Sequence, residues 1–189
     1  MRCVAVQKGV VLSALFAALI SASFFIQIPI GGIPIVIQDM MAMLSGLMLG
    51  PLYGTLAVVI YLALGCLGLP VFSGKGGIQH LIAGPTAGFL VFYALGALFA
   101  GLLLKVLLPE RQEHSRAKSL IVITIAAVLT TAVVFAGGIA GFMIVTGSEL
   151  YAALVATLFP FIPGNVIKIV LMVPLTYKFR PIIARYLRS

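Results

Sequence analysis

The chain has 189 residues, of which 62% are apolar and only 8% are charged. A soluble domain carries roughly 25% charged residues, so this chain cannot cover a surface that faces water. The composition indicates an integral membrane protein that forms a single domain over residues 1–189. The net charge of +8 does not indicate nucleic-acid binding. The basic residues cluster at the ends of apolar segments, where they set topology and attract the lipid headgroups of the bilayer.

Charged residues, glycines and prolines divide the apolar sequence into six expected transmembrane helices: 9–28, 35–49, 52–69, 86–108, 119–145 and 164–179. Roughly 20 helical residues cross the hydrocarbon core, so the first and fourth segments are long enough to span it. The second and third are short and share the turn Gly50-Pro51. Short spans of this kind suggest that one end of the pair borders a cavity lined by protein. The sequence therefore predicts an all-α membrane fold.

The basic residues also orient these helices. With the N-terminus inside, ten lysines and arginines lie on the inner side, and Lys75 and Lys168 lie on the outer side. The positive-inside rule then predicts a multi-pass protein of the cell membrane with both termini in the cytoplasm. A cleaved signal peptide is the alternative for the first segment, because basic residues precede its apolar run. The run continues to Ile28, past Ser21-Ala22-Ser23, which favours an uncleaved helix.

In this orientation the unusual polar side chains gather near the outer face: Gln38, Asp39, Ser73, Lys75, Gln79, His80, Asn165 and Lys168. An ammonium deep in a bilayer costs at least ~2.5–3.5 kcal/mol, so Lys168 is seldom retained in an apolar run without a function. Asn165 comes three residues earlier, so the two side chains share one helix face. The break before Asn165 starts a helix whose positive end favours an anion. The pattern predicts a site for an anionic solute near the outer face.

Simpler interpretations remain for each of these residues. Lys168 could extend along its helix and place its amine at the interface, and Asn165 could cap the helix. Asp39 needs a partner, a proton or water if it lies in a span. Lys168 and Lys75 are its possible partners.

Residues 69–77 are rich in glycine and too apolar for an ordinary loop in water. Glycine lets the backbone approach a ligand closely, so this segment is expected to form a lid or cavity wall, with a structural re-entrant turn as the alternative. Phe72, Phe89 and Tyr93 could line an apolar slot, although each alone is more typical of packing. Phe89 and Tyr93 share one face of their helix.

Ala14, Ala18 and Ala22 repeat every four residues along the first helix. Small residues at this spacing let another helix approach closely in lipid, so they predict an interface with a partner helix.

The sequence contains no set of residues typical of a catalytic site and no metal-binding motif. Its four acidic residues are too few for a proton relay. An enzyme is therefore not expected.

Six motifs, in their order and spacing over residues 10–178, resemble the BioY family, the biotin-binding S components of energy-coupling factor (ECF) transporters. They are Pro34-Ile35-Val36-Ile37-Gln38, Leu49-Gly50-Pro51, Tyr61-Leu62-Ala63-Leu64-Gly65, Gly68-Leu69-Pro70-Val71-Phe72, Gly84-Pro85-Thr86-Ala87-Gly88 and Pro160-Phe161-Ile162-Pro163-Gly164-Asn165-Val166-Ile167-Lys168. The resemblance implies a six-helix S-component fold that binds biotin from outside and needs no cofactor. It also implies that the alanine face of the first helix docks on a membrane coupling protein (EcfT-like). That partner carries two ATPase subunits, which would hydrolyse ATP.

The resemblance also implies roles for single residues. Lys168 would neutralise the biotin carboxylate, Asn165 and Gln38 would contact polar groups, and the loop that contains Lys75 would close over the ligand. The chain departs from the family at Asn165, where Asp is usual, and at Phe89, where Tyr is frequent. Two alternatives remain open: an S component for another anionic vitamin, and a solitary biotin carrier without ATPase partners. The one-sided polar cluster disfavours a purely structural subunit.

Overall fold

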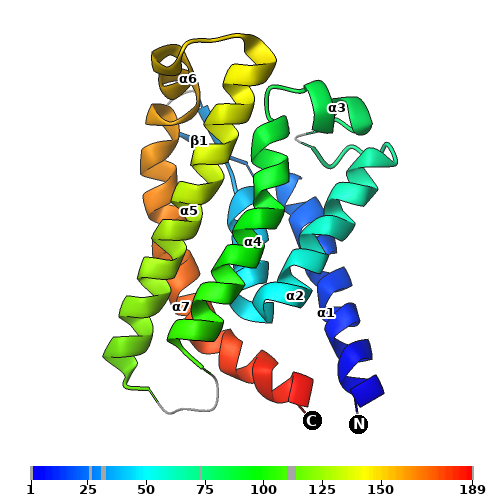
Figure 1. The fold of residues 1–189 in the computed structure, drawn as a ribbon, viewed down its shortest axis with the longest axis vertical. Coiled ribbons are helices and arrows are strands. Elements are labelled where there is room, and N and C mark those ends of the chain that lie inside the picture. The colour runs from blue at the N-terminus through cyan, green and yellow to red at the C-terminus, as the bar shows by residue number, and fades with distance from the viewer. Residues whose placement is uncertain (1, 26, 31–32, 73, 110–113, 189) are drawn as a thin grey trace.

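The computed structural model describes residues 2–25, 27–30, 33–72, 74–109 and 114–188. Figure 1 shows long helices packed side by side, with both termini at the same end of the bundle. Within the described residues, five helical segments are long and apolar enough to cross a membrane: Val6–Phe25, Gln38–Cys66, Ala87–Leu107, Arg116–Thr146 and Leu150–Leu187.

The N-terminal part of the chain contains a β-hairpin that the sequence analysis did not predict. Its elements, in order, are helix α1 (Arg2–Ala22), the 3-10 turn η1 (Ser23–Phe25), and the antiparallel strands β1 (Gln27–Ile30) and β2 (Ile33–Val36). The assignment of residues 27–28 and 35–36 to helices was therefore wrong. The β-branched residues here favour extended backbone, and Pro29 and Pro34 lack the N–H that a helix interior needs. The all-α prediction holds for the bundle and fails at this hairpin.

Helix α2 (Gln38–Cys66) folds back on itself at Gly50, whose φ of 81° and ψ of −177° interrupt the helix. Ser45 Oγ donates to the Gly54 carbonyl at 3.0 Å, and a Cβ on Gly54 would lie 2.6 Å from Gly46 Cα. In a straight helix residues 46 and 54 would be roughly 12 Å apart. The two halves of α2 are therefore antiparallel neighbours, as Figure 1 shows. They correspond to the two short predicted helices that share Gly50-Pro51.

The rest of the chain is helical: α3 (Ile78–Ala83), α4 (Ala87–Leu107), α5 (Arg116–Thr146), α6 (Leu150–Thr157), the 3-10 turn η2 (Phe159–Phe161) and α7 (Ile162–Arg188). Helices α4 and α5 match the predicted segments 86–108 and 119–145 to within three residues. Helix α6 lies in a stretch that was not assigned to any element. Helix α7 begins close to its predicted start and continues beyond the predicted end at residue 179.

Helix α2 is the centre of the bundle and packs against α1, α4 and α7. Glycines bring α4 into backbone contact with it, since a Cβ on Gly46 would lie 2.1 Å from the Ala97 carbonyl oxygen and one on Gly101 would lie 2.3 Å from Pro51 N. Ser13 on α1 donates to the Tyr53 carbonyl at 2.8 Å. These close contacts hold α2 against α1 and α4. They thereby also hold Gln38 and Asp39, which lie at the start of α2.

Candidate ligand-binding site

A buried ion pair joins the beginning of α2 to the first turns of α7. Lys168 Nζ donates to both carboxylate oxygens of Asp39 at 2.7 Å, and the two side chains are 7% and 11% exposed. Lys168 therefore does not extend to the interface, and of the two possible partners for Asp39 the structure selects Lys168. A buried charge that loses its partner typically destabilises a protein by about 3–5 kcal/mol. Each of these residues thus requires the other.

Asn165 lies one turn before Lys168 and is buried. Among the described residues its Oδ1 has no hydrogen-bond partner. An unpaired buried acceptor costs about 1–3 kcal/mol, so this oxygen is suited to accept from a bound molecule. Together with the ion pair it forms a compact cluster of donors and acceptors, which we call the polar cluster: Asp39, Asn165 and Lys168.

Gln38 holds the surroundings of the polar cluster in place. Its Nε2 donates to the Val71 carbonyl at 2.7 Å and to the Ile20 carbonyl at 3.3 Å. Both amide hydrogens are therefore used to tie the loop after α2 and the end of α1 to the start of α2. Tyr61, which the sequence analysis did not single out, also donates to Val71 at 3.4 Å. Its only signal in the sequence was its place in one of the family-like motifs.

The loop after α2 is anchored by Phe72, which is 3% exposed. The Phe72 ring packs edge-on against Tyr61 with 5.6 Å between ring centroids, and it fills the space that a side chain at Gly65 would need. Phe72 and Lys75 exchange two backbone hydrogen bonds of 2.8 and 3.0 Å. The Lys75 side chain is exposed, and Ser73 lies outside the described residues. Phe72 is therefore part of the core, whereas Lys75 is open to an approaching solute.

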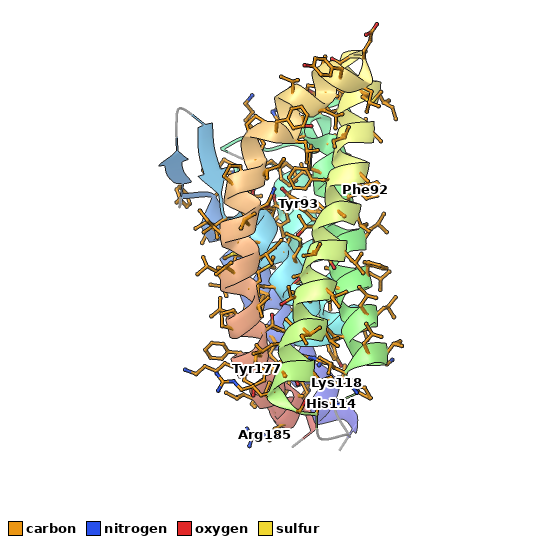
Figure 2. All side chains as sticks on the ribbon, turned by 90° about the vertical axis from the view of Figure 1, so that its left-hand side faces the viewer. Phe92, Tyr93, His114, Lys118, Tyr177 and Arg185 are labelled. Carbon is orange, nitrogen blue, oxygen red and sulfur yellow. The ribbon has the colours of Figure 1, made fainter. Side chains whose placement is uncertain are left out.

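The two aromatic residues of α4 lie in different surroundings. Phe89 packs edge-on against Phe135 of α5 at 5.5 Å and covers Gly138. Tyr93 packs against both hydrophobic clusters of the bundle, one of which contains Met40, the residue that follows Asp39. Figure 2 shows Tyr93 well away from the end of the bundle that carries the termini. Tyr93 is thus the aromatic residue that we place beside the polar cluster.

The predicted partner-helix residues are on the outside of the bundle. Ala14, Ala18 and Ala22 are all exposed on α1, whereas the neighbouring Ser13 and Ala17 are buried against α2. The alanine face is therefore available to another helix and separate from the polar cluster.

A bundle of apolar helices with a buried ion pair and a buried, unpaired acceptor near one end is typical of a membrane protein that binds a small polar solute. Residues 2–185 match the model of the BioY family, and the chain belongs to this family. A protein named biotin transporter BioY from Rhodobacter capsulatus is 37% identical over 175 residues, which cover 87% of this chain and 88% of the relative. A relative of the same name from Rhizobium etli is 39% identical over 166 residues, covering 86% and 88%.

The fold also matches a solved structure. It is the crystal structure of the S component for biotin from an ECF-type ABC transporter. The TM-score is 0.77 and the sequence identity 31%, over 92% of this chain and 91% of the other.

Proposed function

We propose that this protein is the substrate-binding S component of an ECF-type vitamin importer and that it captures biotin from outside the cell. The observation that carries the proposal is the buried pair of Asp39 and Lys168 together with the buried, unpaired acceptor Asn165 Oδ1. Relatives and a solved structure named for biotin, similar over most of the chain, support this choice of ligand. ATP would be hydrolysed by two ATPase subunits bound to a membrane coupling protein.

The chain crosses the membrane six times in this proposal, and each half of α2 counts as one crossing. An even number of crossings agrees with the two termini lying at the same end of the bundle. The excess of basic residues at that end supports an orientation in which both termini lie in the cytoplasm. The polar cluster then lies toward the outside.

The ion pair changes the role that we assign to Lys168. The family resemblance implies that Lys168 neutralises the biotin carboxylate. However, the charge of Lys168 is already compensated by Asp39 at 2.7 Å. The polar cluster thus offers donors and acceptors without net charge. A ureido ring, which has two N–H donors and one carbonyl acceptor, complements such a cluster. Asn165 Oδ1 and Asp39 would accept from the ring, and a remaining N–H of Lys168 would donate to it.

The carboxylate of biotin needs a different partner. It is separated from the ureido group by the ring system and an aliphatic chain, whereas Asn165 and Lys168 lie one helical turn apart, about 5–6 Å between Cβ atoms. We assign the carboxylate to Lys75, whose side chain is exposed on the loop after α2. Tyr93 would pack against the apolar part of the ligand. Phe72 would hold the loop rather than contact the ligand.

The test compares biotin with its neutral primary amide by titration calorimetry on purified protein. We expect wild type to bind the acid more tightly, and Lys75→Gln to remove that difference by weakening only the acid, by about two- to fivefold for an exposed pair. Lys168→Gln should weaken both ligands equally. If the preference for the acid over the amide disappears in Lys168→Gln instead, Lys168 rather than Lys75 binds the carboxylate.

The same measurements decide between the broader alternatives. If wild type does not bind biotin, the proposed function is wrong, and a panel of anionic vitamins can be screened by thermal stabilisation, because a ligand of the native state raises its stability. Uptake measured with and without coupling subunits separates an S component from a solitary carrier.

A further inference from the structure

A cavity of about 590 Å³ lies at the end of the bundle that carries the termini. It is formed where the end of α4, the start of α5 and the second half of α7 meet. The described polar residues that line it are His114, Ser119, Thr176, Tyr177, Lys178, Arg180 and Arg185. Figure 2 shows His114, Tyr177 and Arg185 close together at this end, far from Tyr93.

Three of the described lining residues are basic, Lys178, Arg180 and Arg185, and none of the described lining residues is acidic. Lys178 and Arg185 are exposed at its edge. Arg180 donates to the Leu104 and Leu108 carbonyls at 3.1 Å each, so it compensates the negative end of α4. The N-terminus of α5, which is the positive end of the helix dipole, adds to the positive potential at the cavity. The cavity therefore favours a negatively charged group.

Two polar atoms of the cavity lining are buried without a partner among the described residues. Thr176 is 0% exposed and its Oγ1 is unpaired, and the same holds for Nε2 of the half-buried His114. Buried polar atoms are nearly always hydrogen-bonded, so both atoms, unpaired among the described residues, are suited to bind a further molecule. Phosphate oxygens accept from hydroxyl, imidazole and ammonium donors alike.

The surroundings of the cavity distinguish a lipid from a soluble anion. Leu108, Ile123 and Pro181 line it beside the charges, and the adjoining helices expose Ile121 and Ile182. A small soluble phosphate would gain nothing from this apolar surface, whereas the glycerol and acyl chains of a phospholipid would cover it. Basic pockets between helices near the cytoplasmic surface are suited to lipid headgroups.

We propose that this cavity binds an anionic phospholipid, with the phosphate near Thr176 and His114 and the acyl chains along α5 and α7. The site is separate from the polar cluster, so it holds whether or not biotin is the transported ligand. The proposed orientation identifies the lipid as one of the cytoplasmic leaflet.

The experiment counts phosphatidylglycerol and phosphatidylcholine retained by the purified full chain in native mass spectrometry. We expect wild type to retain phosphatidylglycerol preferentially. Lys178→Gln/Arg185→Gln should lower that retention about 25-fold, or roughly fivefold for each charge. Lys105→Gln/Arg116→Gln is the matched control, because it removes one lysine and one arginine that are exposed near this end and do not line the cavity. Equal retention by the two double variants would overturn the proposal.

Two further arms distinguish a lipid site from a structural hydroxyl and from a site for a soluble anion. Thr176→Val keeps the side-chain size and should lower phosphatidylglycerol retention several-fold, while the melting temperature of the lipid-free protein stays unchanged or rises. A fall in melting temperature with unchanged lipid retention would instead show a structural hydroxyl and contradict the proposal. Millimolar glycerol 1-phosphate should not displace the lipid. Displacement would make this a soluble-anion site and overturn the assignment to lipid.

Discussion

Asp39 and Lys168 set the chemistry of the buried site together, because neither charge is stable there alone. Their pairing places a carboxylate and an ammonium next to the Asn165 amide without leaving net charge in the core. A site of this kind selects by the pattern of donors and acceptors rather than by charge attraction. In the proposed function the anion contact therefore moves from Lys168 to Lys75.

The buried pair predicts coupled effects on stability. Asp39→Asn leaves Lys168 buried without its counter-charge, so the free energy of unfolding should fall by about 3–5 kcal/mol. Asp39→Asn/Lys168→Gln removes both charges and should recover much of that loss. The measurement is unfolding in denaturing detergent, with the exposed Lys75→Gln as control, which should change stability by no more than about 0.5 kcal/mol. Strictly additive losses in the double variant would show that the two charges do not interact.

At the scale of elements, the reversal of α2 at Gly50 places Asp39 opposite α7. The two halves meet at Gly54, where a Cβ would lie 2.5 Å from the Ser45 carbonyl oxygen. Gly54→Ala must therefore separate the halves, so we expect a loss of about 3 kcal/mol in stability, at the upper end for overpacking, together with weaker ligand binding. The readouts are detergent unfolding and calorimetry on the same preparation.

Gly147→Ala is the control for this prediction. Gly147 ends α5 with φ at 67°, and nothing lies within 4 Å of a Cβ added there. Only backbone strain of about 1–2 kcal/mol is expected, with ligand affinity unchanged. If both variants weakened binding equally, close packing within α2 would not be what positions the site.

The sequence predicted the long apolar helices, the Gly50-Pro51 turn and the shared face of Asn165 and Lys168, because these follow from composition and local spacing. It did not predict the β-hairpin, although an Ile/Val-rich run with Gly31-Gly32 at its centre is a hairpin signal. That run was as apolar as its flanks, so hydropathy assigned its ends to helices. The partner of Asp39 lies 129 residues away in the chain, and only packing could select Lys168 over Lys75.

At the scale of the whole molecule, the bundle carries the three proposed sites on three separate surfaces. The polar cluster lies toward one end, the cationic cavity lies at the other, and the alanine face of α1 runs along the side. A partner that docks on α1 therefore need not touch either site. This separation allows docking to be disrupted without changing ligand affinity, provided that the alanine face is the docking surface.

Ala14→Leu/Ala18→Leu tests that condition. Both alanines are exposed, so the larger side chains should leave folding and biotin affinity unchanged while they keep a partner helix from approaching closely. We expect at least about a tenfold loss of coupling protein in co-purification, or roughly 1.4 kcal/mol of association energy. Ala136→Leu/Ala140→Leu is the matched control, since α5 exposes alanines at the same spacing on a different face. Equal losses from both helices would mean that added bulk in the bilayer, rather than a docking face on α1, weakens the assembly. Unchanged co-purification of the α1 variant would place the partner on another helix.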